Sequence, residues 1–223
     1  MTLAELISRY RILANDKAAP FFVSDDEARD FLNEAENQAC IRGRMIHAAD
    51  DAEVCDLVVS AGRALYEFHP SLIEIDNCCF RENGAARRGP PIEFHSQEWL
   101  DDCVQDWRDK SGAPRYAILN DTSIRLVPRP SVGGLLIFEG YRAPKHPMSK
   151  TTDSPEIARH HHEHLVQWAL FRAFSIPDSE FIDPTRAAAA ESAFAAYFGP
   201  LVDVDLRRLT REDFPHVTRS FMP

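Results

Sequence analysis

Apolar residues near the start of the chain recur with the period of an α-helix. Within residues 3–13 they fall every three or four positions, so they would line one side of a short helix. They are Leu3, Leu6, Ile7, Tyr10 and Leu13. The polar loop NDKAAP ends this pattern, which therefore predicts one short helix that packs by a single face.

A second and longer helical pattern follows in FFVSDDEARDFLNEAENQACIRGRMI. Ser24 and Glu27 have the capping-box spacing, in which the hydroxyl accepts a free backbone amide and the carboxylate reaches back to the cap. The three acids at positions 25–27 suit the positive end of the helix dipole. The expected buried face runs through Ala28, Phe31, Leu32, Ala35 and Ala39 to Met45 or Ile46.

At about residue 54 the pattern changes to short β-branched and aromatic runs, interrupted by Gly62 and Pro70, which predict paired strands. IEFHS predicts another strand, and Ser96 can cap a short helix in QEWLDDCVQDW. RYAILNDTSIRLVPRP predicts a hairpin with ND at its tip, and GGLLIFEGYRAP predicts a final strand. Residues 54–143 are therefore expected to form a β-rich insertion.

Helical patterns resume in the last third of the chain. Ser154-Pro155 and Asp183-Pro184 each place a capping residue before a proline at the first helical position. Gly199 suits the end of the second of these helices. Residues 200–223 show no sustained period, which predicts an extended tail that becomes ordered against a partner.

These elements predict an α+β fold in which the N- and C-terminal helices form a helical bundle, because neither pair could bury its apolar face alone. A β-rich insertion would project from the middle, and an extended C-terminal tail would follow. The expected domains are 1–53 for the N-terminal helices of the bundle, 54–143 for the insertion, 144–199 for the C-terminal helices and 200–223 for the tail.

Composition is that of an ordinary globular protein, with 223 residues of which 44% are hydrophobic and 27% charged. No apolar run reaches the roughly 20 residues of a membrane span, and the first residues lack a signal-peptide pattern, so we expect no membrane partner. Five cysteines without a CxxC spacing favour reduced thiols in a cytosolic setting. A net charge of −10 argues against a protein that grips duplex DNA, but suits a surface past which DNA moves.

Four of the nine histidines lie in the segment RHHHEH at residues 159–164. On a helix, His161 and His164 would lie about 40° and 20° from Ile157 on the apolar side, and the other two would lie towards its edges. Glu156, His160 and His164 could place three ligands in a row, but HExxH is absent and no second ligand cluster is evident. We therefore expect histidines that pack, hydrogen-bond and titrate near neutrality rather than bind a metal.

No other motif indicates catalysis. Cys78 and Cys79 are adjacent on a predicted strand, so they would point to opposite faces and could not share an ion. The chain has no GxSxG, Walker or Rossmann glycine pattern, and its acidic runs SDDEARD and WLDDCVQDW are typical of helix caps and solvated faces. We expect no catalytic residue, no metal site and no cofactor.

Two segments supply candidate interaction residues. The loop RENGAARRGPP carries three arginines, which could contact nucleic acid, remain solvated or form salt bridges at a subunit interface. The tail carries apolar side chains that have no core of their own. The predicted interface residues are Arg81, Arg87, Arg88, Leu201, Val202, Leu206, Phe214 and Phe221.

Five segments occur in the order and spacing of a known family. They are the capped helix FFVSDDEARDFLNEAENQACIRGRM, the strand pair VVSAGRALYEFHPSLIEID, the hairpin SGAPRYAILNDTSIRLVPRP, the strand LLIFEGYRAPKHPM with its YR.P ending, and the closing helices that begin at SPEIARHHHEHLVQWALFRAF. Together they resemble the head-to-tail connector, or adaptor, proteins of tailed bacteriophages. The resemblance covers about residues 3–199.

The resemblance implies a non-enzymatic structural protein of the virion neck that is assembled in the host cytoplasm. It implies a homo-oligomeric ring, usually of twelve copies, beneath the portal protein, with a tail or nozzle protein docked below. DNA would pass through the lumen without sequence-specific binding, and an acidic lumen would repel its phosphates. In related connectors, tails such as residues 200–223 reach onto the portal or a neighbouring subunit.

Three alternatives stay open on the sequence. The first is a tail-completion or head-closure protein one layer lower in the virion. The second is a metal-dependent hydrolase built on the histidine cluster. The third is a DNA-binding accessory protein, whose binding would weaken steeply with salt.

Overall fold

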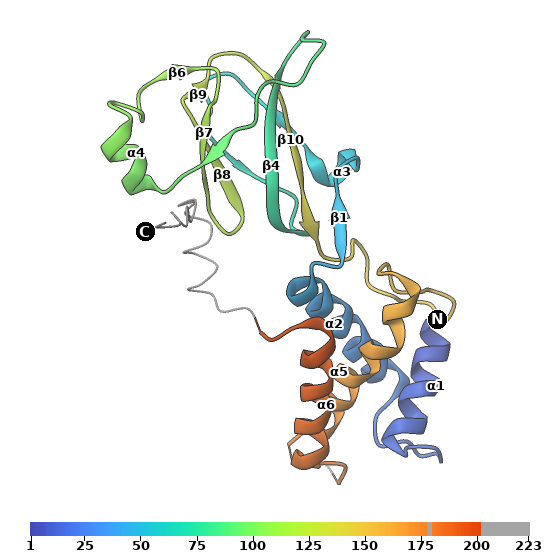
Figure 1. Cartoon of the computed structure of the whole chain (residues 1–223). Coiled ribbons are helices and arrows are strands. Elements are labelled where there is room, and N and C mark those ends of the chain that lie inside the picture. The colour runs from blue at the N-terminus through green and yellow to red at the C-terminus, as the bar shows by residue number, and fades with distance from the viewer. Residues whose placement is uncertain (178–179, 202–223) are drawn as a thin grey trace, which may run out of the picture. The chain divides into compact units, whose positions relative to one another are not determined.

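The computed structural model describes residues 1–177 and 180–201 and has a mixed α+β fold, which confirms the predicted class. The described residues divide into two units that alternate along the chain (Figure 1). We call residues 1–47, 71–74 and 141–201 the helical unit, and residues 48–70 and 75–140 the β unit. The bundle arrangement, the tail and the domain boundaries stay predictions.

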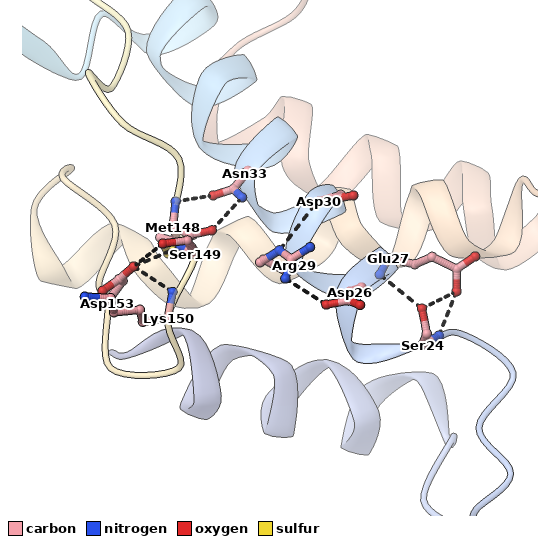
Figure 2. Close-up of polar contacts among 10 residues, drawn as sticks. All are labelled: Ser24, Asp26, Glu27, Arg29, Asp30, Asn33, Met148, Ser149, Lys150 and Asp153. Atoms are coloured by element: carbon pink, nitrogen blue, oxygen red, sulfur yellow. Dashed lines mark hydrogen bonds and ion pairs between the residues drawn. The ribbon is translucent and has the colours of Figure 1, made fainter.

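The helical unit begins with two capped helices. α1 spans Leu3–Ala14 and starts at a capping box in residues 2–5, which the sequence patterns had not indicated. α2 spans Asp25–Gly43, and its predicted capping box is confirmed (Figure 2). The amide of Glu27 donates to Ser24 Oγ at 3.2 Å, and the amide of Ser24 donates to the Glu27 carboxylate at 2.7 Å. This helix starts where its local sequence places it.

α6 spans Pro184–Phe198, with Asp183 as its N-cap and Gly199 as its C-cap, and both predictions are confirmed. The Asp183 carboxylate accepts the amides of the first turn, as an N-cap requires. α6 shares one hydrophobic core with the other three long helices of the unit. Each helix contributes at least one fully buried side chain, among them Tyr10, Leu32, Leu165 and Phe194.

α5 spans His162–Phe174 and follows a 3-10 turn at Arg159–His161, so the prediction of a helix that starts at Ser154 is wrong. In a helix capped by Ser154, its hydroxyl would accept the amides of residues 156 and 157. Both amides instead donate to Oε1 of Glu36, at 2.5 and 3.2 Å. A buried carboxylate of α2 thus replaces the local cap, and the helix begins later.

α2 also holds the chain segment that precedes α5 through Asn33. The side-chain amide of Asn33 donates to the Met148 carbonyl at 3.0 Å, while its oxygen accepts the Met148 amide at 2.8 Å (Figure 2). Five residues further on, Asp153 accepts the amides of Ser149 and Lys150 at 2.9 and 2.8 Å. The segment is therefore shaped by side-chain acceptors rather than by a helical or sheet ladder.

Glu36 lies in a polar cluster of the helical unit with only 1% of its surface exposed. Beside it, the Glu156 carboxylate accepts the Arg142 guanidinium on both oxygens and the Lys145 amide at 3.1 Å. Burial raises the pKa of Glu36, because the charged form loses its hydration. The hydrogen bond from Arg142 lowers the pKa of Glu156. The pKa values of the two neighbouring carboxyls are therefore shifted in opposite directions.

The described strands form two larger sheets and one small pair. One sheet has the order β1-β10-β2, with β4 also paired to β10, the second has the order β3-β8-β7-β5, and β6 pairs with β9. The elements of this region are β1 Ile46–Ala48, α3 Ala52–Cys55, β2 Asp56–Val59, β3 Leu65–Glu67, β4 Leu72–Glu82, β5 Glu93–Phe94, α4 Gln97–Cys103, β6 Ser111–Gly112, β7 Tyr116–Leu119, β8 Ser123–Val127, β9 Arg129–Pro130 and β10 Gly134–Arg142.

The predicted hairpin and the predicted short helix of the β unit are both confirmed. β7 and β8 pair antiparallel around the ND tip, with Tyr116 opposite Val127. Ser96 Oγ accepts the Trp99 amide at 3.1 Å and so caps α4. The strand predicted at IEFHS is present only as the two residues of β5, which pair in parallel with β7.

Replacing Glu36 by alanine should leave two buried amides without their acceptor. Each such loss costs about 1–3 kcal/mol, so we expect the free energy of unfolding to fall by about 2–5 kcal/mol in urea titrations. Glu34→Ala on the same helix is the control, because Glu34 forms a partly exposed ion pair with Arg172 and should cost about 1 kcal/mol or less. Equal losses for the two variants would contradict the assigned role.

Glu36→Gln isolates the charge at the same position. Because its pKa is raised in the folded protein, Glu36 stays protonated there at pH values where the unfolded chain already ionises. The wild-type protein should therefore lose stability as pH rises from the ordinary value of 4.5 through the raised pKa. The variant lacks this loss, so its stability relative to wild type should increase over that range. A difference that stays constant with pH would refute the prediction.

Candidate functional site

The histidine cluster contains one deeply buried ring. His162 is 3% exposed, its Nε2 lies 2.9 Å from the Ile157 carbonyl, and its Nδ1 lies 2.8 Å from the amino nitrogen of Met1. Because a carbonyl can only accept, Nε2 carries the proton of this contact. The prediction that His162 lies towards the edge of the apolar side is wrong. The helix begins at His162 itself, so helical angles measured from Ile157 do not apply.

His161 and His164 lie partly buried against Tyr197 of α6. The His164 ring stacks on Tyr197 with 3.5 Å between centroids, and His161 Nδ1 lies 3.1 Å from the Tyr197 hydroxyl. Burial, followed by the charges of the neighbouring histidines, lowers the pKa of His161. His160 is exposed. The cluster therefore joins the ends of two helices by ring contacts.

The cysteines are not arranged as a second site. Cys78 and Cys79 are both buried, and burial raises the pKa of both thiols. Cys103 of α4 is exposed, and no disulfide links any of the five. Within residues 1–177 and 180–201, no group of three or more His, Cys, Asp or Glu side chains is placed to hold a metal ion.

The predicted arginines lie on a hairpin that extends β4, and we call residues 81–89 the arginine hairpin. A tight turn at residues 82–85 places Gly84 at a φ of 83°, a conformation that favours glycine. On the returning side, the amide of Gly89 donates to the Phe80 carbonyl at 2.9 Å. The arm is therefore a hydrogen-bonded projection rather than the open loop that the composition suggested.

The three arginines of this hairpin differ in their surroundings. Arg88 pairs with Glu139 of β10 at 2.9 Å. Arg87 is exposed near the tip and Arg81 is partly buried, and neither guanidinium forms a hydrogen bond or ion pair with any residue that the structure describes. Among the predicted tail residues, Leu201 is 71% exposed. The others, Val202, Leu206, Phe214 and Phe221, lie outside the described residues.

One side of α4 carries Glu98, Trp99 and Asp102 within a single turn, and we call these residues the acidic face of α4. The opposite side is anchored by the fully buried Leu100. Glu98 and Asp102 are exposed, as expected for this acidic run, and Trp99 is partly buried. The sequence patterns had not distinguished this face from an ordinary solvated helix.

Exposed apolar side chains in the helical unit were also missed. Phe21, Phe22 and Ile182 are 44%, 56% and 49% exposed. The Phe22 ring stacks on Phe181 with 5.1 Å between centroids, and the Arg11 guanidinium lies 4.0 Å from the Phe21 centroid. The available signal was two consecutive phenylalanines just before the capping box, where the chain has no helical face on which to bury them.

The family model described as SU10 adaptor protein matches residues 1–218 of the chain. The chain belongs to this family. The SU10 adaptor proteins are a family of phage head-to-tail adaptors, so the resemblance drawn from the sequence is confirmed. Comparison with curated proteins finds no match to the chain.

Membership of the SU10 adaptor family supports a structural adaptor role in a bacteriophage particle. It places this role at the virion neck, in interaction with other head and tail proteins, and indicates a non-enzymatic function. In the described part of the chain, no helix is long and apolar enough to cross a membrane.

Replacing His162 by alanine tests whether the buried ring is structural. The change removes the donor to the Ile157 carbonyl, and we expect the free energy of unfolding to fall by about 1–3 kcal/mol in urea titrations near neutral pH. The matched control is His160→Ala, which alters an exposed ring two residues away and should stay within about 0.5 kcal/mol of wild type. A larger loss for the His160 variant would overturn this assignment.

Proposed function

We propose that the chain assembles into a homo-oligomeric ring that joins the portal to a tail or nozzle protein. The proposed number of copies is twelve, the usual number in such rings. DNA passes through the lumen of this ring without sequence-specific binding. The observation that carries the proposal is the match of the adaptor family to residues 1–218, which spans the helical unit, the β unit and most of the tail. In this proposal the four long helices act as the bundle and the β unit acts as its insertion.

The exposed features of both units support a protein that works through its surface. A protomer of a closed ring needs two different and complementary contact surfaces, because each copy meets one neighbour on each side. The exposed group of Phe21, Phe22 and Ile182 and the arginine hairpin are candidates for such contacts. The net charge of −10 favours a lumen that repels phosphates and lets DNA slide.

The tail completes the proposal as a contact with the portal or with a neighbouring subunit. Leu201 is exposed at the end of the described residues, and further apolar side chains, Val202, Leu206, Phe214 and Phe221 among them, follow it in a sequence without a helical or strand period. Apolar groups that have no core of their own gain free energy when a partner covers them. We therefore assign contact roles to Leu201, Val202, Leu206, Phe214 and Phe221.

The other functions fit these observations less well. A tail-completion or head-closure protein one layer lower would use the same kinds of surface. Only the identity of its binding partner distinguishes it from an adaptor. For a metal-dependent hydrolase, the central His162 would have to give up its contact at one of the two ring nitrogens in order to bind an ion. The pairing of Arg88 with Glu139 leaves the arginine hairpin less able to bind DNA phosphates.

The direct experiment is to mix the purified chain with the portal protein of the same phage and image the complex by cryo-electron microscopy. We expect a ring with twelvefold symmetry at one end of the portal. Binding to isolated tail proteins with none to the portal would favour the tail-completion function instead.

A variant that ends at Leu201 should unfold like the full chain but bind the portal about tenfold more weakly, equivalent to about 1.4 kcal/mol.

A further inference from the structure

The β unit presents two surfaces of opposite charge on different sides. The arginine hairpin extends beyond the end of β4, whereas α4 lies at the far side of β7 and β8 (Figure 1). Arg87 is exposed on the hairpin, and Glu98 and Asp102 are exposed on the acidic face of α4. A charged projection and an opposite charged face on one body are the requirements of a head-to-tail contact between identical copies.

The hairpin is held ready to dock. Gly89 approaches the Phe80 carbonyl so closely that a Cβ atom there would lie 2.6 Å from its oxygen. The amide of Asn83 donates to the Gly133 carbonyl at 3.0 Å, which ties the hairpin to the loop before β10. A surface arm fixed in this way loses little conformational freedom when it binds. The exposed Arg87 therefore lies on a hairpin whose backbone is already ordered before binding.

The acidic face of α4 lacks a cation of its own among the described residues. Glu98 and Asp102 are one helical turn apart, and like charges at this spacing destabilise a helix. The nearby Arg108 is committed to Asp101, which also accepts the Trp107 indole at 2.8 Å. A guanidinium from outside would relieve this repulsion.

The aromatic content of the same face favours arginine as the incoming group. Trp99 is next to Glu98 in α4 and is partly buried: its ring stacks on His95 with 3.6 Å between centroids and packs against the buried cluster of Leu100, Trp107 and Val127. Arginine combines a planar cation that stacks on aromatic rings with donors that fit carboxylates. Lysine would supply only the charge.

We propose that the arginine hairpin of one copy docks on the acidic face of α4 of the next copy. In this interface Arg87 makes the main contact and Arg81 a second one. This inference rests on the proposed ring and names one of its subunit contacts. A second copy is the occupant favoured by charge, because a chain of net charge −10 repels nucleic acid as a whole yet carries an acidic target for its own arginines.

Charge reversal tests the contact in the full-length chain by sedimentation velocity. Arg87→Glu and Asp102→Lys should each weaken self-association about tenfold, because each places like charges opposite one another. Combining both changes in one chain, or mixing the two single variants in equal amounts, should restore association. The controls are Arg159→Glu and Asp121→Lys, which make the same charge changes at other exposed positions and should have no effect.

A cysteine variant gives a second readout that uses a native thiol. Cys103 is exposed and follows Trp99 by one turn of α4, so it lies beside the acidic face. Under mild oxidation, the new thiol of Arg87→Cys on the hairpin of one copy should form a disulfide with Cys103 on α4 of the next copy. The linked copies should appear as a ladder of covalent oligomers on non-reducing gels. Adding Cys103→Ser should abolish the ladder. Dimers alone would mean that like cysteines have paired, and would count against the contact.

The outcomes separate this contact from the ring itself. If the wild-type chain self-associates and neither reversal weakens it, the contact is wrong and the proposed ring stands. If the reversals leave association unchanged but Arg87→Glu abolishes salt-dependent binding to a duplex DNA probe, the hairpin binds nucleic acid instead. A wild-type chain that stays monomeric, gives no ladder with Arg87→Cys and forms no ring on the portal overturns both proposals.

Discussion

The helical unit depends on two side chains of α2 that bind the backbone of the segment before α5. That segment belongs to neither a helix nor a sheet, so its buried amides and carbonyls need other partners. Asn33 satisfies both polar groups of Met148, and Glu36 accepts the amides of residues 156 and 157. Without these acceptors the desolvated amides would oppose the packing of the segment. The late start of α5 follows from this constraint.

The same constraint explains why the histidine cluster is structural. Because α5 begins at His162, this ring lies at the start of the helix and binds the Ile157 carbonyl in the turn before it. His161 and His164 then meet Tyr197 near the end of α6. A run of residues that resembles a metal site in the sequence thus fastens a helix start to its neighbours.

Several elements were predictable because their determinants are local. The capping box of Ser24 and Glu27, the Asp183 cap and the β7–β8 hairpin each depend on side chains within a few residues of the backbone they shape. The start at Ser154 failed because Glu36, 120 residues away in sequence from Glu156, competes for the same amides. The candidate interaction surfaces were likewise predictable only in part. The arginines were found by composition, whereas the exposure of Phe21 followed only from the tertiary structure.

By itself, the sequence determined the mixed α+β class, most helix ends, the β7–β8 hairpin and, through motif order, the adaptor family. These properties follow from local hydrogen bonding and from apolar period, which any short stretch of chain carries within itself. Only the tertiary structure decided which acceptor the amides after Ser154 use, that His162 is buried, and that Arg87 lies on a hydrogen-bonded hairpin. Each of these results depends on a partner that is distant in sequence, and local patterns carry no record of that partner.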